Sequence, residues 1–137
     1  MATTPTLLRD SAGLAVVVQE GESCNLTVTF QDMTGATINK ASLITLTCTL
    51  FDWTTAAVIN SRNDQTVLDA NNGLVASDGT LTLRLGPLDN IIVGTPASGT
   101  KEIHCCLFTW TWSDGVATRT GRSDPLGVQV QNLPAVT

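Results

Sequence analysis

The sequence predicts an all-β protein built as a two-layer antiparallel β-sandwich of about seven to eight strands. Three segments alternate apolar and polar residues with a period of two, the pattern of a strand with one face in a core and the other in water. Turn-forming dipeptides separate these segments, and no strand-helix-strand rhythm is visible. About one residue in six is threonine, which fits a half-exposed pleated surface. Together these observations favour stacked antiparallel sheets over a parallel sheet.

The clearest alternating segment is SCNLTVTFQ at residues 23–31, where every second side chain is apolar. LITLTCTLFD at 43–52 and TLTLRL at 80–85 repeat the pattern, with threonine at most of the outward positions. The run IHCCLFTWTW at 103–112 is instead apolar on both faces in its centre, which is typical of a central strand covered on both sides. These four segments form the predicted framework.

Shorter strands are expected at residues 13–19, 57–60 and 126–131, each bordered by segments rich in turn-forming residues. Residues 63–72 are the only segment that suggests a short helical turn.

The chain is predicted to form one domain with short extensions. The Asp-Gly pairs at 78–79 and 114–115 predict tight hairpins, because this dipeptide tolerates the positive φ that such turns need. Residues 1–12 are expected to form an extended N-terminal arm, 13–132 the sandwich, and 133–137 a C-terminal tail.

Two arrangements, immunoglobulin-like and jelly-roll-like, suit this number of short strands. In immunoglobulin domains a disulfide joins an early and a late strand beside a buried tryptophan. Cys24 and either Cys105 or Cys106 fall on such strands, but Trp53 comes too late along the chain. The chain also contains no tyrosine for a tyrosine corner. The sequence therefore supports two layers and leaves the subtype open.

The aromatic residues of the late strand form the candidate interface. Phe108, Trp110 and Trp112 share one face of this strand. The favoured interpretation places Phe108 and Trp110 in the core and Trp112 at its rim, near the hairpin turn. If this stripe were instead exposed, it would form an interaction surface together with Trp53. A subunit contact would be the preferred interpretation of that surface, and a sugar-stacking platform the alternative.

The residue spacing indicates no catalytic, cofactor-binding or metal-ligating set. His104, Cys105 and Cys106 are consecutive, and consecutive strand residues point to opposite faces, so these three cannot readily share a zinc ion. In the segment DANNG at 69–73 the glycine comes one position too early for a calcium loop, and no bidentate glutamate follows at the required position. A plain turn is therefore favoured. No nucleophile elbow, phosphate loop or triad is present, and we expect no enzymatic activity and no cofactor.

Charge and length of apolar runs argue against several classes of function. The net charge is −5 and only two residues are lysine, so binding to nucleic acid is not expected. The N-terminus lacks an export signal and no apolar run could cross a bilayer, so we expect a soluble, unexported chain without membrane contacts. Its cysteines are then expected to be reduced, although pairing among the four stays open; they are Cys24, Cys48, Cys105 and Cys106.

A resemblance to a known class of proteins covers most of the chain from about residue 20 onward. The stretches that carry it are TLTCTLFDWTTAAVINSR (45–62), VLDANNG (67–73), SDGTLTLRLGPLDNIIV (77–93), EIHCCLFTWTWSDG (102–115) and VQVQNLPAV (128–136). In this order they resemble small virion structural proteins of tailed bacteriophages. The resemblance implies a compact β-sandwich that binds the capsid or the head-tail region and performs no chemistry.

The function expected from this resemblance is that of a capsid decoration or cement protein. Such a protein is made in the host cytoplasm, joins the virion, and stabilises the assembled head by binding the major capsid protein or other virion proteins, with homo-oligomers expected in the particle. One alternative is a head-tail joining or neck ring protein. Another is a carbohydrate-binding or adhesion module that uses Trp110 and Trp112. A threonine-rich, weakly charged surface suits assembly, because charged residues are depleted at interface centres.

Overall fold

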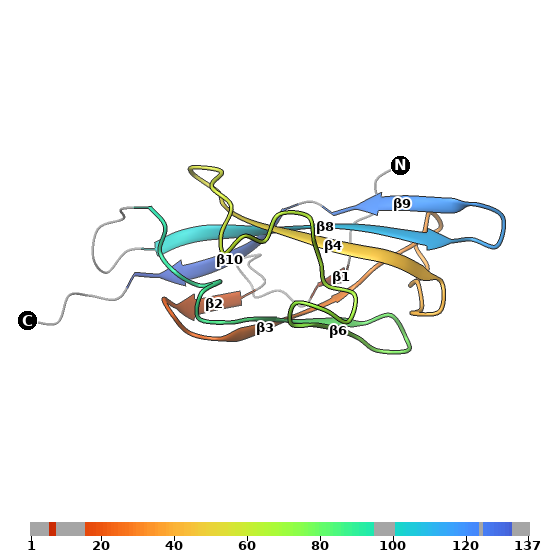
Figure 1. Ribbon diagram of the computed structural model, residues 1–137, viewed down its shortest axis with the longest axis horizontal. Coiled ribbons are helices and arrows are strands. Elements are labelled where there is room, and N and C mark those ends of the chain that lie inside the picture. The colour runs from red at the N-terminus through yellow and green to blue at the C-terminus, as the bar shows by residue number, and fades with distance from the viewer. Residues whose placement is uncertain (1–5, 8–15, 95–100, 124, 133–137) are drawn as a thin grey trace, which may run out of the picture.

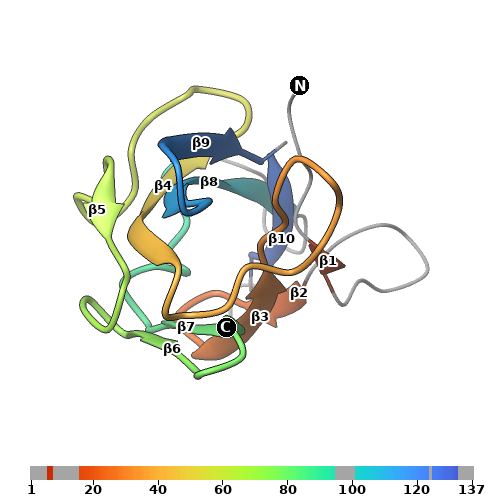
Figure 2. The same cartoon turned by 90° about the vertical axis from the view of Figure 1, so that its right-hand side faces the viewer.

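The computed structural model describes residues 6–7, 16–94, 101–123 and 125–132, and these residues form strands and turns without a helix. The strands are β1 (Thr6–Leu7), β2 (Val16–Gln19), β3 (Cys24–Thr29), β4 (Leu43–Asp52), β5 (Gln65–Thr66), β6 (Gly73–Val75), β7 (Leu81–Leu85), β8 (Lys101–Ser113), β9 (Thr118–Arg122) and β10 (Leu126–Gln131). They form a four-stranded sheet, β1-β3-β7-β6, and a six-stranded sheet, β2-β10-β8-β4-β5, with β9 also paired to β8. Figures 1 and 2 show the sheets as two layers, which confirms the predicted all-β sandwich.

The strand order favours the immunoglobulin-like arrangement over the jelly roll. In the immunoglobulin fold one sheet holds strands A, B, E and D, and the other holds G, F and C. The order β1-β3-β7-β6 matches the first set. The order β10-β8-β4 matches the second, with β9 and β10 acting together as one interrupted final strand along β8.

One strand pair departs from the predicted antiparallel arrangement. β2 runs parallel to β10, with Val16 opposite Val128. β1 and β2 follow each other in the chain but lie at the edges of different sheets. The N-terminal segment therefore adds an edge strand to each layer, which no period-two pattern could reveal.

The core lies between the layers and is formed by the inward positions of the alternating strands. On β8 these include Cys106, Phe108 and Trp110, all fully or almost fully buried. Phe30, which follows β3, packs edge-on against Phe108 with ring centroids 5.7 Å apart and lies tilted against Trp110 at 4.9 Å. Phe30 follows a strand of one sheet, whereas Phe108 and Trp110 lie on a strand of the other, so these rings join the two sheets. Large aromatic side chains of this kind dominate core energetics. Leu107, on the outward face of β8, stays partly exposed, so β8 is central in its sheet but is not fully covered on its outer face.

Several expected boundaries are corrected. Residues 57–60 form no strand, since only Val58 makes an isolated bridge, to Phe51. Residues 63–72 contain the short strand β5 and turns instead of a helical turn, and positive φ angles at residues such as Asn71 interrupt any regular backbone. Both predicted Asp-Gly hairpins are present, with φ of 92° at Gly79 and 90° at Gly115.

The extensions are only partly within the described residues. Of the expected arm at 1–12, Thr6 and Leu7 are described, and they pair with β3. The expected tail at 133–137 lies outside the described residues.

Candidate functional site

The aromatic residues proposed as an interface lie mostly in the core. Phe108, Trp110 and Trp112 are at most 4% exposed, so they form no surface stripe. Trp112 lies one residue before the end of β8 and is 4% exposed, so its ring is buried although it stands near the hairpin turn. Trp53, in the turn after β4, is 59% exposed and is the only one of these four aromatic residues at the surface.

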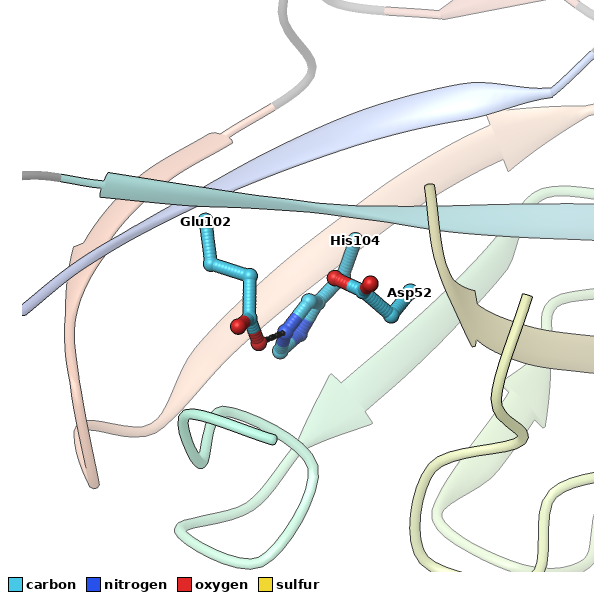
Figure 3. A group of neighbouring side chains, drawn as sticks. All are labelled: Asp52, Glu102 and His104. Carbon is cyan, nitrogen blue, oxygen red and sulfur yellow. Dashed lines mark hydrogen bonds and ion pairs between the residues drawn. The ribbon is translucent and has the colours of Figure 1, made fainter. Parts of the chain in front are cut away.

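A different group of side chains converges near the start of β8. Glu102 and His104 lie two residues apart on the inward face of β8, and the strand register places Asp52, the last residue of β4, directly opposite His104. Figure 3 shows the three side chains meeting between the layers. One potential ligand atom from each lies within 4.8 Å of the others. Their exposed fractions are 1%, 8% and 0% for Asp52, Glu102 and His104, so the group is buried.

Glu102 is held in place by the imidazole and by backbone amides. His104 Nε2 lies 2.5 Å from Glu102 Oε1. The same oxygen accepts a hydrogen bond from the amide of Val93 at 2.9 Å, and Oε2 accepts one from the amide of Gly94 at 2.8 Å. The Glu102 carboxylate therefore ties the segment that follows β7 to the start of β8.

Asp52 is held on one side only. Its Oδ2 accepts hydrogen bonds from the Thr55 amide at 2.8 Å and the Thr55 hydroxyl at 2.9 Å. Its Oδ1 is buried and has no hydrogen-bond partner among the described residues, and the same is true of His104 Nδ1. Buried polar atoms are nearly always paired, so two orphaned atoms in one small group are an unusual feature.

The group borders an open pocket of about 510 Å³. Asp52 and Glu102 contribute to its wall, and the exposed Trp53 and Lys101 flank them. The pocket gives solutes a route to the two carboxylates.

This group is not predicted from the sequence, because the chain neighbours of His104 are Cys105 and Cys106, whereas its spatial neighbours are Glu102 and Asp52. Cys105 lies on the outward face of β8, whereas Cys106 points inward and contacts Cys48, so the structure does not assemble the consecutive set that was considered for zinc. The Glu-x-His spacing in a strand was the available signal for Glu102. Asp52 could be found only from the strand register.

All four cysteines are free thiols. A hydrogen bond with Cys48 and complete burial both raise the pKa of Cys106 well above its usual value. Burial likewise raises the pKa of Cys24 and of Cys105. The thiols of Cys24, Cys105 and Cys106 are therefore protonated and weakly reactive near neutral pH.

The segment considered as a calcium loop is occupied by its own contacts. Asp69 accepts a hydrogen bond from the Val75 amide at 2.9 Å and pairs with Lys40 at 2.5 Å. The Asn71 amide group donates to the Thr66 carbonyl at 2.8 Å. These are the contacts of a turn, in agreement with the favoured interpretation.

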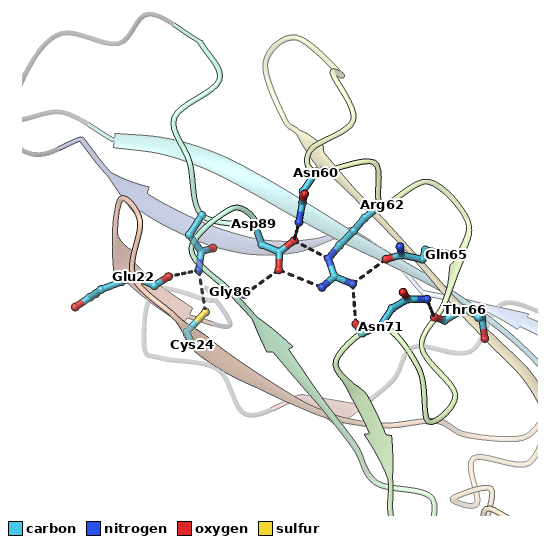
Figure 4. A network of polar contacts seen from close by, with 10 residues as sticks. Glu22, Cys24, Asn60, Arg62, Gln65, Thr66, Asn71, Gly86 and Asp89 are labelled. Carbon is cyan, nitrogen blue, oxygen red and sulfur yellow. Dashed lines mark hydrogen bonds and ion pairs between the residues drawn. The ribbon is translucent and has the colours of Figure 1, made fainter.

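A second buried polar network joins the two sheets (Figure 4). Arg62 donates from Nε and Nη2 to the two carboxylate oxygens of Asp89, at 2.6 and 3.1 Å. Its Nη1 donates to Gln65 and to the carbonyl of Asn71. Because the guanidinium has several partners and the carboxylate is bidentate, this network is satisfied and structural.

The outer face of the six-stranded sheet is lined by threonine. In the register, Thr47 lies opposite both Thr66 and Thr109, and Thr111 lies opposite both Thr45 and Thr120. The hydroxyls of Thr45 and Thr111 are 2.5 Å apart. We call this surface the threonine face; its members are Thr45, Thr47, Thr49, Thr66, Thr109, Thr111 and Thr120.

No protein-family model matches the chain, and no curated protein matches it. The part of the chain that the structure describes has no helix long and apolar enough to cross a bilayer.

Proposed function

We propose that the protein is a non-enzymatic virion structural protein of a tailed bacteriophage, acting as a capsid decoration or cement protein. The observation that carries the proposal is the threonine face, spread over β4, β5, β8 and β9. Its members are uncharged, and the charged residues Arg122, opposite Thr109, and Asp64 lie beside them. The resemblance of the sequence to small phage structural proteins supports the choice of partner, the major capsid protein.

The physical properties of the threonine face suit contact with another protein. Threonine side chains are short and uncharged, so they lose less rotamer entropy and less hydration on contact than lysine or glutamate. A decoration protein that binds assembled subunits and not dissociated ones stabilises the assembled state by mass action. No chemistry is needed for that role.

Binding to heads stripped of the protein tests the proposal. We expect the wild-type chain to bind such heads and to restore their heat resistance. Thr47→Lys and Thr109→Lys place a charge in the middle of the threonine face and should abolish binding. Thr27→Lys is the matched control, because Thr27 is an exposed strand residue of the other sheet. Equal binding by all four chains would rule out the threonine face as the docking surface.

Counting copies of the protein in purified particles by quantitative mass spectrometry separates the assembly roles. A decoration protein follows the number of capsid subunits, whereas a head-tail joining or neck ring protein is present in about a dozen copies. Absence from purified particles would contradict both roles. Homo-oligomers, which we expect in the particle, are checked in solution by light scattering.

A carbohydrate-binding or adhesion role is a second candidate with a narrower basis. Trp110 and Trp112, on which it was first based, are buried, but the exposed Trp53 stands beside the open pocket that Asp52 and Glu102 border. An exposed indole next to carboxylates can stack on a sugar ring. A change of tryptophan fluorescence on a panel of sugars, lost in Trp53→Ala, would favour this role over assembly.

A further inference from the structure

The group formed by Asp52, Glu102 and His104 poses an electrostatic problem that lies outside the assembly role. Two carboxylates are buried within 4.8 Å of each other and of an imidazole nitrogen. Burying charge without a compensating partner is strongly unfavourable. No ion pair among the described residues brings a lysine or arginine to Asp52 or Glu102. The lysine and arginine pairs are Lys40 with Asp69, Arg62 with Asp89, and Arg119 with Asp114, and the one pair of Glu102 is with the His104 imidazole.

We propose that Asp52, Glu102 and His104 bind one divalent transition-metal cation, with Zn²⁺ as the first candidate. The cation supplies the positive charge that the buried carboxylates lack. It also gives Asp52 Oδ1 the partner that it otherwise lacks.

The donor set selects the class of metal. One imidazole nitrogen with carboxylate oxygens suits Zn²⁺, Fe²⁺ or Co²⁺, whereas Ca²⁺ and Mg²⁺ prefer oxygen ligands alone. Zinc sites with three protein ligands leave a position for water or another ligand. The pocket beside Trp53 and Lys101, which Asp52 and Glu102 also line, would provide the route of entry.

The geometry needs little adjustment. Ligand atoms around a tetrahedral Zn²⁺ with bonds of about 2.1 Å lie about 3.4 Å apart. The three potential ligand atoms already lie within 4.8 Å of one another, and the Glu102–His104 contact of 2.5 Å would lengthen by about 1 Å. The backbone amides of Val93 and Gly94 hold Glu102 and the Thr55 contacts hold Asp52, so outer partners orient both carboxylates.

The single histidine of the chain provides a direct test without any substitution. Untagged, ¹⁵N-labelled protein is treated with a chelator, dialysed and titrated with Zn²⁺ while the two imidazole nitrogen resonances are followed by NMR. We expect both to move and to saturate at one equivalent. With free Zn²⁺ at about a hundredfold excess over Kd, Tm should rise by about 10 °C. Unchanged resonances and Tm would overturn the proposal.

The same spectra detect the alternative in which a doubly protonated imidazole clamps the two carboxylates without a metal. Resonances of a doubly protonated ring that persist in excess Zn²⁺ would identify that clamp and overturn the metal site.

Variants then assign the ligands. Co²⁺ should give visible absorption bands with the wild-type chain, and Asp52→Asn or His104→Gln should lower its affinity by about 100-fold or more. Asp89→Asn is the matched control, since it removes the charge of another buried carboxylate that lies outside the group and should leave Co²⁺ binding unchanged. An equal loss of Co²⁺ affinity in Asp89→Asn would show that the loss comes from impaired folding. Unchanged Co²⁺ affinity in both Asp52→Asn and His104→Gln would overturn the assignment of these residues as ligands.

Discussion

At the scale of single residues, the pair formed by Arg62 and Asp89 is a contact whose disruption should be costly. Both side chains are buried, and the pair links the connection after β4 in the six-stranded sheet to the segment after β7 in the other sheet. Gly86 and Asn60 donate further hydrogen bonds to the same carboxylate. Removing one partner leaves the other charge buried without compensation, which costs much more than the pair itself contributes.

Replacing Asp89 by asparagine should therefore lower the free energy of unfolding by about 3 kcal/mol, as measured by urea denaturation. The matched control is Asp64→Asn, because Asp64 is exposed, and its effect should stay within about 0.5 kcal/mol. Arg62→Met combined with Asp89→Asn should lose less than the sum of the two single variants. Strict additivity would contradict the direct coupling of the two residues.

The same pair predicts a pH dependence. Burial acts to raise the pKa of Asp89, but the hydrogen bonds from Arg62 and Asn60 outweigh it and leave this pKa below its usual 3.8. Because the native pKa is lowered, the stabilisation is fully present above about pH 4 and is lost as the pH falls through the native value. Denaturation curves between pH 2 and 6 should show a decline on the acid side that is shallower in Asp89→Asn than in the wild-type chain. Parallel curves would contradict this assignment.

At the scale of elements, the position of β9 on β8 depends on a glycine. Gly121 lies opposite Trp110 on the inward side, and a Cβ atom at this position would lie 2.5 Å from the indole ring. Gly121→Ala should therefore destabilise the protein by about 1–3 kcal/mol through overpacking. Thr120→Ala, at the exposed neighbouring position, is the control and should be close to neutral. A neutral Gly121→Ala would show that β9 can move away from the core without loss.

The pairing of β4 with β8 also determines the reactivity of the thiols. Cys48 and Cys106 are fully buried between the sheets, whereas Cys24 is partly exposed at the start of β3. A thiol reagent should modify Cys24 first, and in Cys24→Ser the remaining reaction should follow the rate of unfolding. Rapid modification of a second thiol in the native Cys24→Ser protein would contradict the burial of the other three thiols, Cys48, Cys105 and Cys106.

At the scale of the whole molecule, one hydrophobic cluster includes residues from both sheets. A shared core of this kind makes unfolding a single cooperative event. Denaturation followed by tryptophan fluorescence, which reports on Trp110 and Trp112 in the core, should coincide with denaturation followed by far-ultraviolet circular dichroism. Separate midpoints would indicate that one sheet loses its structure before the other.

The two proposed binding sites lie on opposite faces of the same sheet. The threonine face lies on the outer side of β4 and β8, whereas Asp52, Glu102 and His104 lie on the inner side of the same two strands. Loss of metal binding and loss of head binding should therefore be separable by different substitutions.

The sequence by itself determined the layers, the main strands and the two Asp-Gly hairpins, because alternation and turn chemistry are local properties of the chain. It also indicated that Phe108 and Trp110 belong to the core. Only the tertiary structure decided the parallel pairing of β2 with β10, since pairing depends on which edge a distant segment reaches. In the same way Asp52 meets His104 only through the register of β4 on β8, and a contact between residues so far apart in the chain leaves no periodic signal in the sequence.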